Sequence, residues 1–493
     1  MMNNLLIMPL LVPLVTAVVL IFFNRQIRLQ KWISGLSALA NVGVAGYLVH
    51  VVRQEGIQTL NMGGWAAPYG IVFVADMFAA LLVLTTTIVS AACLYYAFGS
   101  IGKEREKFYF YPFFQFLIVG VIGSFLTGDI FNLFVCFEVM LISSYALIVL
   151  GGTKKQLRES LKYILINIIS SALFVASVAY LYAVVGTLNM AHLSVRVAEA
   201  GQGGVLTTIS VLFLIVFGLK AGLFLYFWLP GSYKVPPAAI TAVFGGLLTK
   251  VGLYAIIRTF TLIFYHDPYI THTLIGWLAA ATMLLGVIGA IAYWDIHRIL
   301  IYNIVAAVGF IAFGLAAANQ AALEGAIYYL VHDMIVKALL FLLGGTIIAY
   351  TGTATIKEMG GLMRTRPVLG WMFFIAAMAL VGVPPLSGFI GKLLIVEGGL
   401  QAGFYWITGI GLLTSLLILY SMMRIFMNVF WGVPKRPLSE PKKGTGWLLL
   451  PASCLVILTI VLGLGAEWIY PYVNQAGETL LNPDQYIQAV LKE

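Results

Sequence analysis

The chain has 493 residues, of which 61% are hydrophobic and only 10% are charged. Because a soluble domain usually has about 25% charged residues, this composition excludes a soluble globular protein and predicts one that is embedded in a membrane. The formal net charge is +9, but the positions of the basic residues along the chain are more informative than their sum.

Fourteen segments are apolar enough to cross a membrane, since a spanning helix needs about 20 mostly apolar residues. In chain order we predict spans near residues 5–23, 32–52, 75–98, 108–126, 130–150, 161–186, 205–229, 236–262, 273–293, 298–318, 323–350, 369–400, 404–430 and 447–468. The first has no A-x-A-like cleavage site, so we expect it to be retained. The fold class that this predicts is an all-α polytopic membrane protein of about 14 transmembrane helices.

The basic residues alternate between the two sides of the predicted bundle. Nineteen lie in the loops that follow odd-numbered spans, at 25–31, 103–107, 154–162, 234, 298, 357–366 and 435–443. The opposite side has four, which are Arg53, Arg196, Arg258 and Lys492. By the positive-inside rule the first set is cytoplasmic. Both termini are then expected to be extracellular, and the charge needs no nucleic acid to explain it.

Two spans contain prolines near their polar residues. Span 7 reads GLKAGLFLYFWLPGSY and contains Pro230, and span 12 reads ALVGVPPLSGFIGKLLIV and contains Pro384, Pro385 and Gly388. Proline removes a backbone donor and opens the helical ladder, although a simple kink would also explain span 7. Broken spans in corresponding positions point to an inverted-repeat transporter. Because the spacing is five spans, we predict that spans 4–8 are repeated with opposite orientation as spans 9–13.

Four lysines lie deep inside apolar segments, at Lys220, Lys250, Lys337 and Lys392. A lysine at the bilayer centre costs about 2.5–3.5 kcal/mol on insertion scales, so four such residues require a function. Burial disfavours the ammonium form, and a nearby carboxylate restores it. A moving negative partner can therefore load and unload a buried lysine. We predict that these four residues transfer protons, and the alternative for any one of them is a structural ion pair.

Glu138 and His332 are the other candidates for proton transfer. Glu138 is about eight residues into its span, which places it about 12 Å deep, and we expect it to pair with Lys220; alternatively, it is a neutral acid bonded to a neighbouring helix. His332 can relay protons near neutral pH, but a structural role is also open. Asp333 precedes Lys337 by four residues and shares its helix face. Interfacial hydration would account for Asp76, Asp129 and Glu324 at the outer span ends.

Several chemistries are excluded by what the sequence lacks. The three cysteines, Cys93, Cys136 and Cys454, each lie alone in an apolar span, so they form no zinc or iron–sulfur motif. There is no G-x-x-x-x-G-K-[ST] phosphate loop for ATP hydrolysis. We therefore predict no cofactor, no metal and no enzyme activity, and energy that comes from an ion gradient or from partner subunits.

These motifs resemble the antiporter-like subunits shared by multisubunit Mrp-type cation/proton antiporters, respiratory complex I and membrane-bound hydrogenases. The matching segments are FVCFEVMLISS with Glu138, GLKAGLFLYFWLP with Lys220, VPPAAITAVFGGLLTKVGLYAIIR with Lys250, VKALLFLLGG with Lys337 and GVPPLSGFIGKLLI with Lys392. The resemblance implies two half-channels joined by a hydrated mid-membrane chain of glutamate, lysines and histidine. The family histidine often stands four residues before the span-11 lysine, where this chain has Asp333.

The resemblance also implies a division of the chain and a set of partners. We expect peripheral helices 1–3 at 1–107, half-channels at 108–264 and 265–432, and helix 14 with a tail at 433–493. Length and ending favour the D-type subunits of Mrp antiporters, which implies a bacterial cell membrane, protons and Na⁺ as transported ions, and partner subunits A, B, C, E, F and G.

Two other functions stay open from the sequence. One is a proton-pumping subunit of a redox-driven complex, complex I or a membrane-bound hydrogenase. The other is a stand-alone channel or a structural scaffold. Such a protein would not couple one ion movement to another and would tolerate the loss of the lysines.

Overall fold

The computed structural model describes residues 2–435 and 448–492, and most of them are helical. Within this part of the chain nine helical stretches are long and apolar enough to cross a membrane. They are α2 (Ile27–Glu55), α3 (Met77–Ser100), α6 (Ile130–Ile148), α7 (Lys154–Val185), Ala238–Leu262, α13 (Pro268–Ala292), α14 (Ile296–Ala317), α15 (Gln320–Thr351) and α19 (Tyr405–Phe430). The shorter apolar helices are α1 (Met8–Phe22), α5 (Phe110–Leu126), α9 (Val205–Ala221) and α17 (Pro367–Val381). The prediction of a multi-pass helical membrane protein is confirmed, whereas the count of fourteen stays a prediction.

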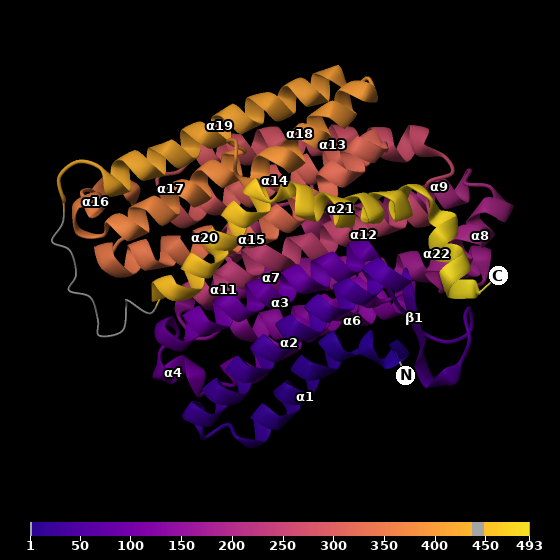
Figure 1. The fold of residues 1–493 in the computed structure, drawn as a ribbon, viewed down its shortest axis with the longest axis horizontal. Helices are drawn as coiled ribbons and strands as arrows, with labels where there is room; N and C mark the ends of the chain where they lie inside the picture. The colour runs from indigo at the N-terminus through magenta and orange to yellow at the C-terminus, as the bar shows by residue number, and fades with distance from the viewer. Residues whose placement is uncertain (1, 436–447, 493) are drawn as a thin grey trace.

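The helices run side by side in one bundle, with α15 near its centre (Figure 1). Helices α1 and α2 form one flank and α19 the other. The stretch Ala238–Leu262 is buried throughout, and α14 and α15 are almost as fully covered. These central helices can therefore hold polar side chains away from lipid.

The two ends of the bundle carry different small elements. Both termini lie at one end, with the antiparallel hairpin of β1 (Gln58–Asn61) and β2 (Val72–Ala75) and with α8 (Met190–Ala200) (Figure 1). The opposite end holds α4 (Lys103–Glu106) and α16 (Leu362–Thr365), which carry basic residues of the predicted inner set. Three other residues of that set, Arg436, Lys442 and Lys443, lie outside the described residues. Single turns of 3₁₀ helix lie at Met2–Leu5, Met62–Gly64 and Ile356–Glu358.

Span 7 is broken, as predicted, but not at its proline. Helix α9 ends at Ala221, and Gly222 follows with a φ of 77° in the left-handed region. Glycine is favoured there because a side chain would be strained. The helix resumes as α10 (Leu229–Ser232), with Pro230 in its first turn, where a missing N–H is tolerated. Gly222 therefore ends the first half-helix, and Pro230 belongs to the start of the second.

Span 12 is broken where the sequence predicted. Helix α17 ends at Val381, and Gly382, at a φ of 88°, caps it. Pro384 and Pro385 lie in the non-helical link, and α18 (Ser387–Gln401) begins directly after it. Gly388 lies in the first turn of α18 and not in the link itself.

Span 8 contains an irregularity that the sequence did not predict. A π-helical segment, Phe244–Leu248, joins α11 (Ala238–Val243) to α12 (Thr249–Leu262). A π-segment widens the helix by one residue and leaves backbone carbonyls without their usual partners, and such segments are frequent at functional sites. This one ends two residues before Lys250.

The chain after span 14 is helical. Helix α20 (Leu449–Leu464) and helix α21 (Ala466–Leu481) meet at a bend of 80°, and α22 (Pro483–Leu491) follows. Tyr470 and Asn474 of α21 donate hydrogen bonds to Glu324 of α15, at 2.7 and 2.9 Å. Glu324 is thus buried under α21, and the expectation that it is hydrated at the interface is wrong.

Asp76 is also fully buried, because it forms an ion pair with Arg258 of α12. The two guanidinium nitrogens lie 2.7 and 2.9 Å from its carboxylate oxygens. Asp76 also caps α3 by accepting the amide N–H of Ala79, while the Arg258 guanidinium lies 5.1 Å from the ring centre of Tyr486 in α22. This pair joins three separate parts of the chain near the end that holds both termini.

The Asp76–Arg258 pair predicts a strong effect on stability. Asp76→Asn leaves a buried guanidinium without its counter-charge, a loss that costs about 3–5 kcal/mol. We expect lower amounts of protein in the membrane and a lower melting temperature of the purified protein. The control is Glu199→Gln, which breaks an exposed pair with Arg196; because exposed pairs contribute about 0–1 kcal/mol, it should change little. Equal effects of the two substitutions would contradict the assignment.

Candidate functional site

Glu138 and Lys220 meet through a serine. Glu138 lies on α6, Ser171 on α7 and Lys220 on α9. The Ser171 hydroxyl donates a hydrogen bond to the Glu138 carboxylate, and the Lys220 amine lies 3.4 Å from the same hydroxyl oxygen. The amine also lies 5.0 Å from the ring centre of Phe137. The predicted pair is therefore bridged by a hydroxyl that the sequence patterns did not reveal, because single serines are common in membrane helices.

At the centre of the bundle Asp333 lies between two lysines. Its carboxylate is 2.8 Å from the amine of Lys250 on α12 and 3.6 Å from the amine of Lys337 on α15. All three side chains are buried. The sequence indicated that Asp333 and Lys337 share a face, but the contact with Lys250 depends on how the stretch Ala238–Leu262 packs against α15 through α11 and the π-helical segment. One carboxylate thus serves two amines.

Each of these two amines also has a backbone carbonyl as acceptor. Lys250 donates to the carbonyl of Gly245, at 2.7 Å, within the π-helical segment. Lys337 donates to the carbonyl of Asn303 on α14, at 2.8 Å. Neutral oxygen acceptors of this kind can hold either an ammonium or a neutral amine that donates one hydrogen. The site therefore accommodates both protonation states of each lysine.

Lys392 lies at the break in span 12. Its amine donates to the carbonyl of Val381, the last residue of α17, at 2.8 Å, and to the hydroxyl of Ser415 at 3.1 Å. A helix C-terminus carries a partial negative charge and unpaired carbonyls, so the break itself provides a position for the amine. The rings of Phe310 and Tyr329 lie 5.3 and 5.6 Å from it. In the described part of the chain no carboxylate forms an ion pair with Lys392.

His332 contacts the same break and not Lys337. Its Nδ1 lies 2.7 Å from the hydroxyl of Ser387, the first residue of α18, and its ring stacks on Tyr329 at 5.3 Å. Among the described residues, Nε2 of His332 has no hydrogen-bond partner. A cavity of about 20 Å³ borders His332 beneath Tyr328 and Leu462, which is room for one water molecule. His332 thus lies between the central cluster and the N-terminal part of α15.

Close helix contacts link the clusters. A Cβ atom at Gly252 of α12 would lie 2.5 Å from the backbone nitrogen of Ala221, so α12 and α9 touch directly beside Lys220 and Lys250. Small residues permit such approaches in membrane bundles. The set comprises Glu138, Ser171, Lys220, Lys250, Asp333, Lys337, His332, Ser387, Lys392 and Ser415. Two carboxylates face four amines in this set, so full protonation of the lysines would leave buried positive charge uncompensated.

Comparison with known sequences identifies the family. The family described as "NADH:quinone oxidoreductase/Mrp antiporter, TM" matches residues 127–418. The chain is 57% identical to the D subunit of the Na⁺/H⁺ antiporter of Bacillus subtilis (strain 168), and the match covers 100% of both chains. It is 54% identical to the protein of the same name from Alkalihalophilus pseudofirmus, again over 100% of both chains.

Comparison with solved structures shows the same fold. A chain of the Mrp complex from Dietzia sp. DQ12-45-1b superimposes with a TM-score of 0.93 at 30% identity, with 100% of both chains covered. A chain of the archaeal membrane-bound sulfane sulfur reductase gives 0.90 at 27% identity, with 99% of each covered. A chain of respiratory complex I from Thermus thermophilus gives 0.81 at 22% identity over 97% of this chain and 100% of that one. The resemblance seen in the motifs is confirmed, and the chain belongs to the D-subunit family of Na⁺/H⁺ antiporters within the larger family of NADH:quinone oxidoreductase and Mrp antiporter subunits.

Proposed function

We propose that this chain is the proton-translocating subunit of a multisubunit antiporter that exchanges Na⁺ or K⁺ for protons. The observation that carries the proposal is the buried Asp333 carboxylate shared by Lys250 and Lys337. On one side of it stands the Glu138–Ser171–Lys220 group, and on the other stand His332 and Lys392. The names and folds of the relatives support the same function.

The shared carboxylate gives the central step a physical basis. An ammonium buried without a counter-charge is strongly disfavoured, so a single carboxylate stabilises one charged lysine better than two. When Asp333 favours Lys250, Lys337 is free to release its proton, and a shift of the carboxylate reverses the preference. A proton that arrives at one lysine therefore promotes release from the other.

The outer members of the path use the same principle. The Glu138 carboxylate, bridged by the Ser171 hydroxyl, favours the charged form of Lys220. If that bridge opened, the charged form would lose its partner and Lys220 would release its proton toward Lys250. At the other end Lys392 lacks a carboxylate partner among the described residues and depends on the open end of α17. We assign the terminal exchange to Lys392, and His332 with its adjacent cavity would carry protons between the central cluster and the outer part of α15.

We assign the two half-channels to residues 108–264 and 265–432, each with one broken helix. This assignment includes fourteen membrane spans and an inverted relation between spans 4–8 and spans 9–13. Non-helical backbone at membrane depth requires burial or water, so the links after Ala221 and Val381 are where we expect water to enter. Residues 1–107 and 433–493 would flank the path.

The proposed setting follows from the relatives and from the charges. The partners would be subunits A, B, C, E, F and G of an Mrp-type complex in the bacterial plasma membrane. Both termini would be extracellular, because the end of the bundle opposite them carries most of the basic loops. The chain would act as a transporter subunit without a cofactor.

The alternative is a proton-pumping subunit of a redox-driven complex. The membrane-bound sulfane sulfur reductase chain has a similar fold at 27% identity. Identity of 57% over the full length to an antiporter subunit favours exchange over redox coupling. The neighbouring genes separate the two, since a redox complex needs iron–sulfur and quinone-site subunits.

The Ser171 bridge predicts a graded effect on exchange. Glu138→Ala should abolish Na⁺-dependent proton movement in vesicles that hold the assembled complex, because it removes the carboxylate. Ser171→Ala should slow exchange, and Ser171→Thr, which keeps the hydroxyl, should largely restore it. Ser177→Ala is the matched control, since among the described residues that serine on the same helix bonds only to the carbonyl of Leu173. Full exchange by the Glu138→Ala complex would remove this pair from the mechanism.

The central carboxylate predicts a stronger effect. Asp333→Asn keeps the shape but leaves Lys250 and Lys337 without their counter-charge. Because a buried lysine can lose its proton, which Arg258 in the Asp76 pair cannot do, we expect both amines to become neutral, so that exchange stops while the complex still assembles. Asp333→Glu restores the charge and should recover part of the rate. The measurements are fluorescence-detected proton movement and co-purification of the partner subunits. If the asparagine variant exchanges ions at the wild-type rate, the shared carboxylate has no role in proton transfer.

Lys392 tests whether the amine must lose its proton. Arginine keeps the positive charge but does not deprotonate in proteins, because its pKa is above about 12. Lys392→Arg should assemble nearly normally and fail to exchange ions, and Lys392→Ala should fail as well. Near-normal turnover of the arginine variant would make Lys392 a fixed electrostatic element.

A further inference from the structure

A large pocket lies beside the broken span 7, at the end of the bundle that carries the basic loops. Its volume is about 700 Å³, and its walls come from α7, α10 and the start of α14. Trp228, which lines the pocket, donates a hydrogen bond to the carbonyl of Leu219, at 3.0 Å. The pocket therefore borders the chain segment that positions Lys220, but it contains none of the proton-transfer residues.

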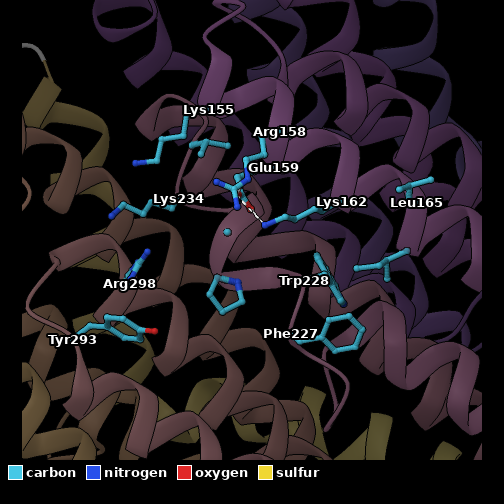
Figure 2. Close-up of a pocket in the computed structure, with 14 residues that line it drawn as sticks. Lys155, Arg158, Glu159, Lys162, Leu165, Phe227, Trp228, Lys234, Tyr293 and Arg298 are labelled. Carbon is cyan, nitrogen blue, oxygen red and sulfur yellow. Dashed lines mark hydrogen bonds and ion pairs between the residues drawn. The ribbon is translucent and has the colours of Figure 1, made fainter.

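One side of the pocket is strongly basic. Figure 2 shows the ends of Lys155, Lys234 and Arg298 on the same side, although they come from three different parts of the chain. Lys234 forms an ion pair with Asp295, at 2.6 Å. Within residues 2–435 and 448–492 neither Lys155 nor Arg298 forms an ion pair with a carboxylate. Two cationic side chains thus face the pocket without a counter-charge.

Among the described residues that line the pocket, the single acidic one already has basic partners. Glu159 lies 3.2 Å from the amine of Lys162 and 3.9 Å from the guanidinium of Arg158. Five basic side chains and one carboxylate line the pocket. Even when Lys234 and Glu159 are counted with their partners, the excess charge is positive, so the pocket selects an anion.

The opposite side of the pocket is apolar and continues along the membrane face of α7. Phe227, Trp228 and Leu165 lie on this side in Figure 2. Beyond the pocket, Leu161, Leu165 and Ile168 are more than half exposed and share one face of α7 at helical spacing. Trp228 and Tyr293 add the aromatic side chains that are typical of the membrane–water interface. An occupant must therefore combine an anionic head with an apolar body.

We propose that this pocket binds an anionic phospholipid of the cardiolipin or phosphatidylglycerol class. Its phosphate lies between Lys155 and Arg298, and its acyl chains follow the exposed face of α7 past Leu165. Basic pockets between membrane helices bind such head groups through charge and hydrogen bonds. A lipid bound here would contact Trp228, whose indole N–H bonds to the carbonyl of Leu219. It would therefore stabilise the non-helical link of span 7. A free phosphate satisfies the charges but leaves the apolar face uncovered, which is why the lipid is favoured.

The test uses the assembled complex, stripped of lipid and titrated with defined lipids by native mass spectrometry. The variant Lys155→Gln with Arg298→Gln removes the two unpaired charges. Because each basic residue near a membrane surface contributes about fivefold to affinity, we expect about 30-fold weaker binding of cardiolipin. The control is Lys103→Gln with Lys107→Gln, which removes two exposed charges from the same end of the bundle and should leave binding unchanged.

A photo-crosslinker at Phe227, a side chain that is 66% exposed, identifies the occupant in native membranes. A phospholipid adduct supports the proposal, and an adduct to another subunit overturns it. Equal binding of phosphatidylethanolamine and cardiolipin, equal binding by the variant and the control, or stabilisation by inorganic phosphate as strong as by cardiolipin would each overturn it as well. If the double variant does not assemble, the single variant Lys155→Gln provides the same comparison with about a fivefold effect.

Discussion

The structure depends on one buried carboxylate. Asp333 lies between the amines of Lys250 and Lys337 in the most enclosed part of the bundle. Two ammonium groups at this depth without Asp333 would repel each other and lack solvent, so they could not both remain charged. This arrangement also responds to a single proton, because the lysine that carries the proton is the one that pairs with the Asp333 carboxylate. The same contact therefore stabilises the centre and makes it responsive.

Irregular helix geometry supplies a backbone acceptor for two of the four lysines, whereas Lys337 uses the Asn303 carbonyl of the continuous helix α14. Lys392 uses the last carbonyl of α17, which the break after Val381 leaves open, and Lys250 uses a carbonyl of the π-helical segment. Regular helices would have used these oxygens in their own backbone ladders. These two departures from regular helix thus lie where Lys392 and Lys250 find neutral acceptors.

The Glu138 end of the candidate set and its centre differ in their surroundings. Glu138 is half-buried on a helix that faces the outside of the bundle, whereas Lys337 and Asp333 are enclosed on every side. The basic pocket beside span 7 is lined by the first half of α7, the helix that also carries Ser171, and α21 covers Glu324 near the start of α15.

The sequence by itself determined the membrane class, the order of the spans, the two broken helices and the lysines, because hydropathy, proline and buried charge act locally along the chain. The contact between Asp333 and Lys250, the Ser171 bridge and the burial of Asp76 and Glu324 were decided by the tertiary structure. Each of these joins residues that are at least 33 positions apart, so no local pattern contains them. The break at Gly222 was also hidden, because glycine is common in membrane helices and Pro230 offered a stronger local signal. Which residue pairs with each buried charge thus depends on how the helices pack across the bundle, and this is what only the tertiary structure shows.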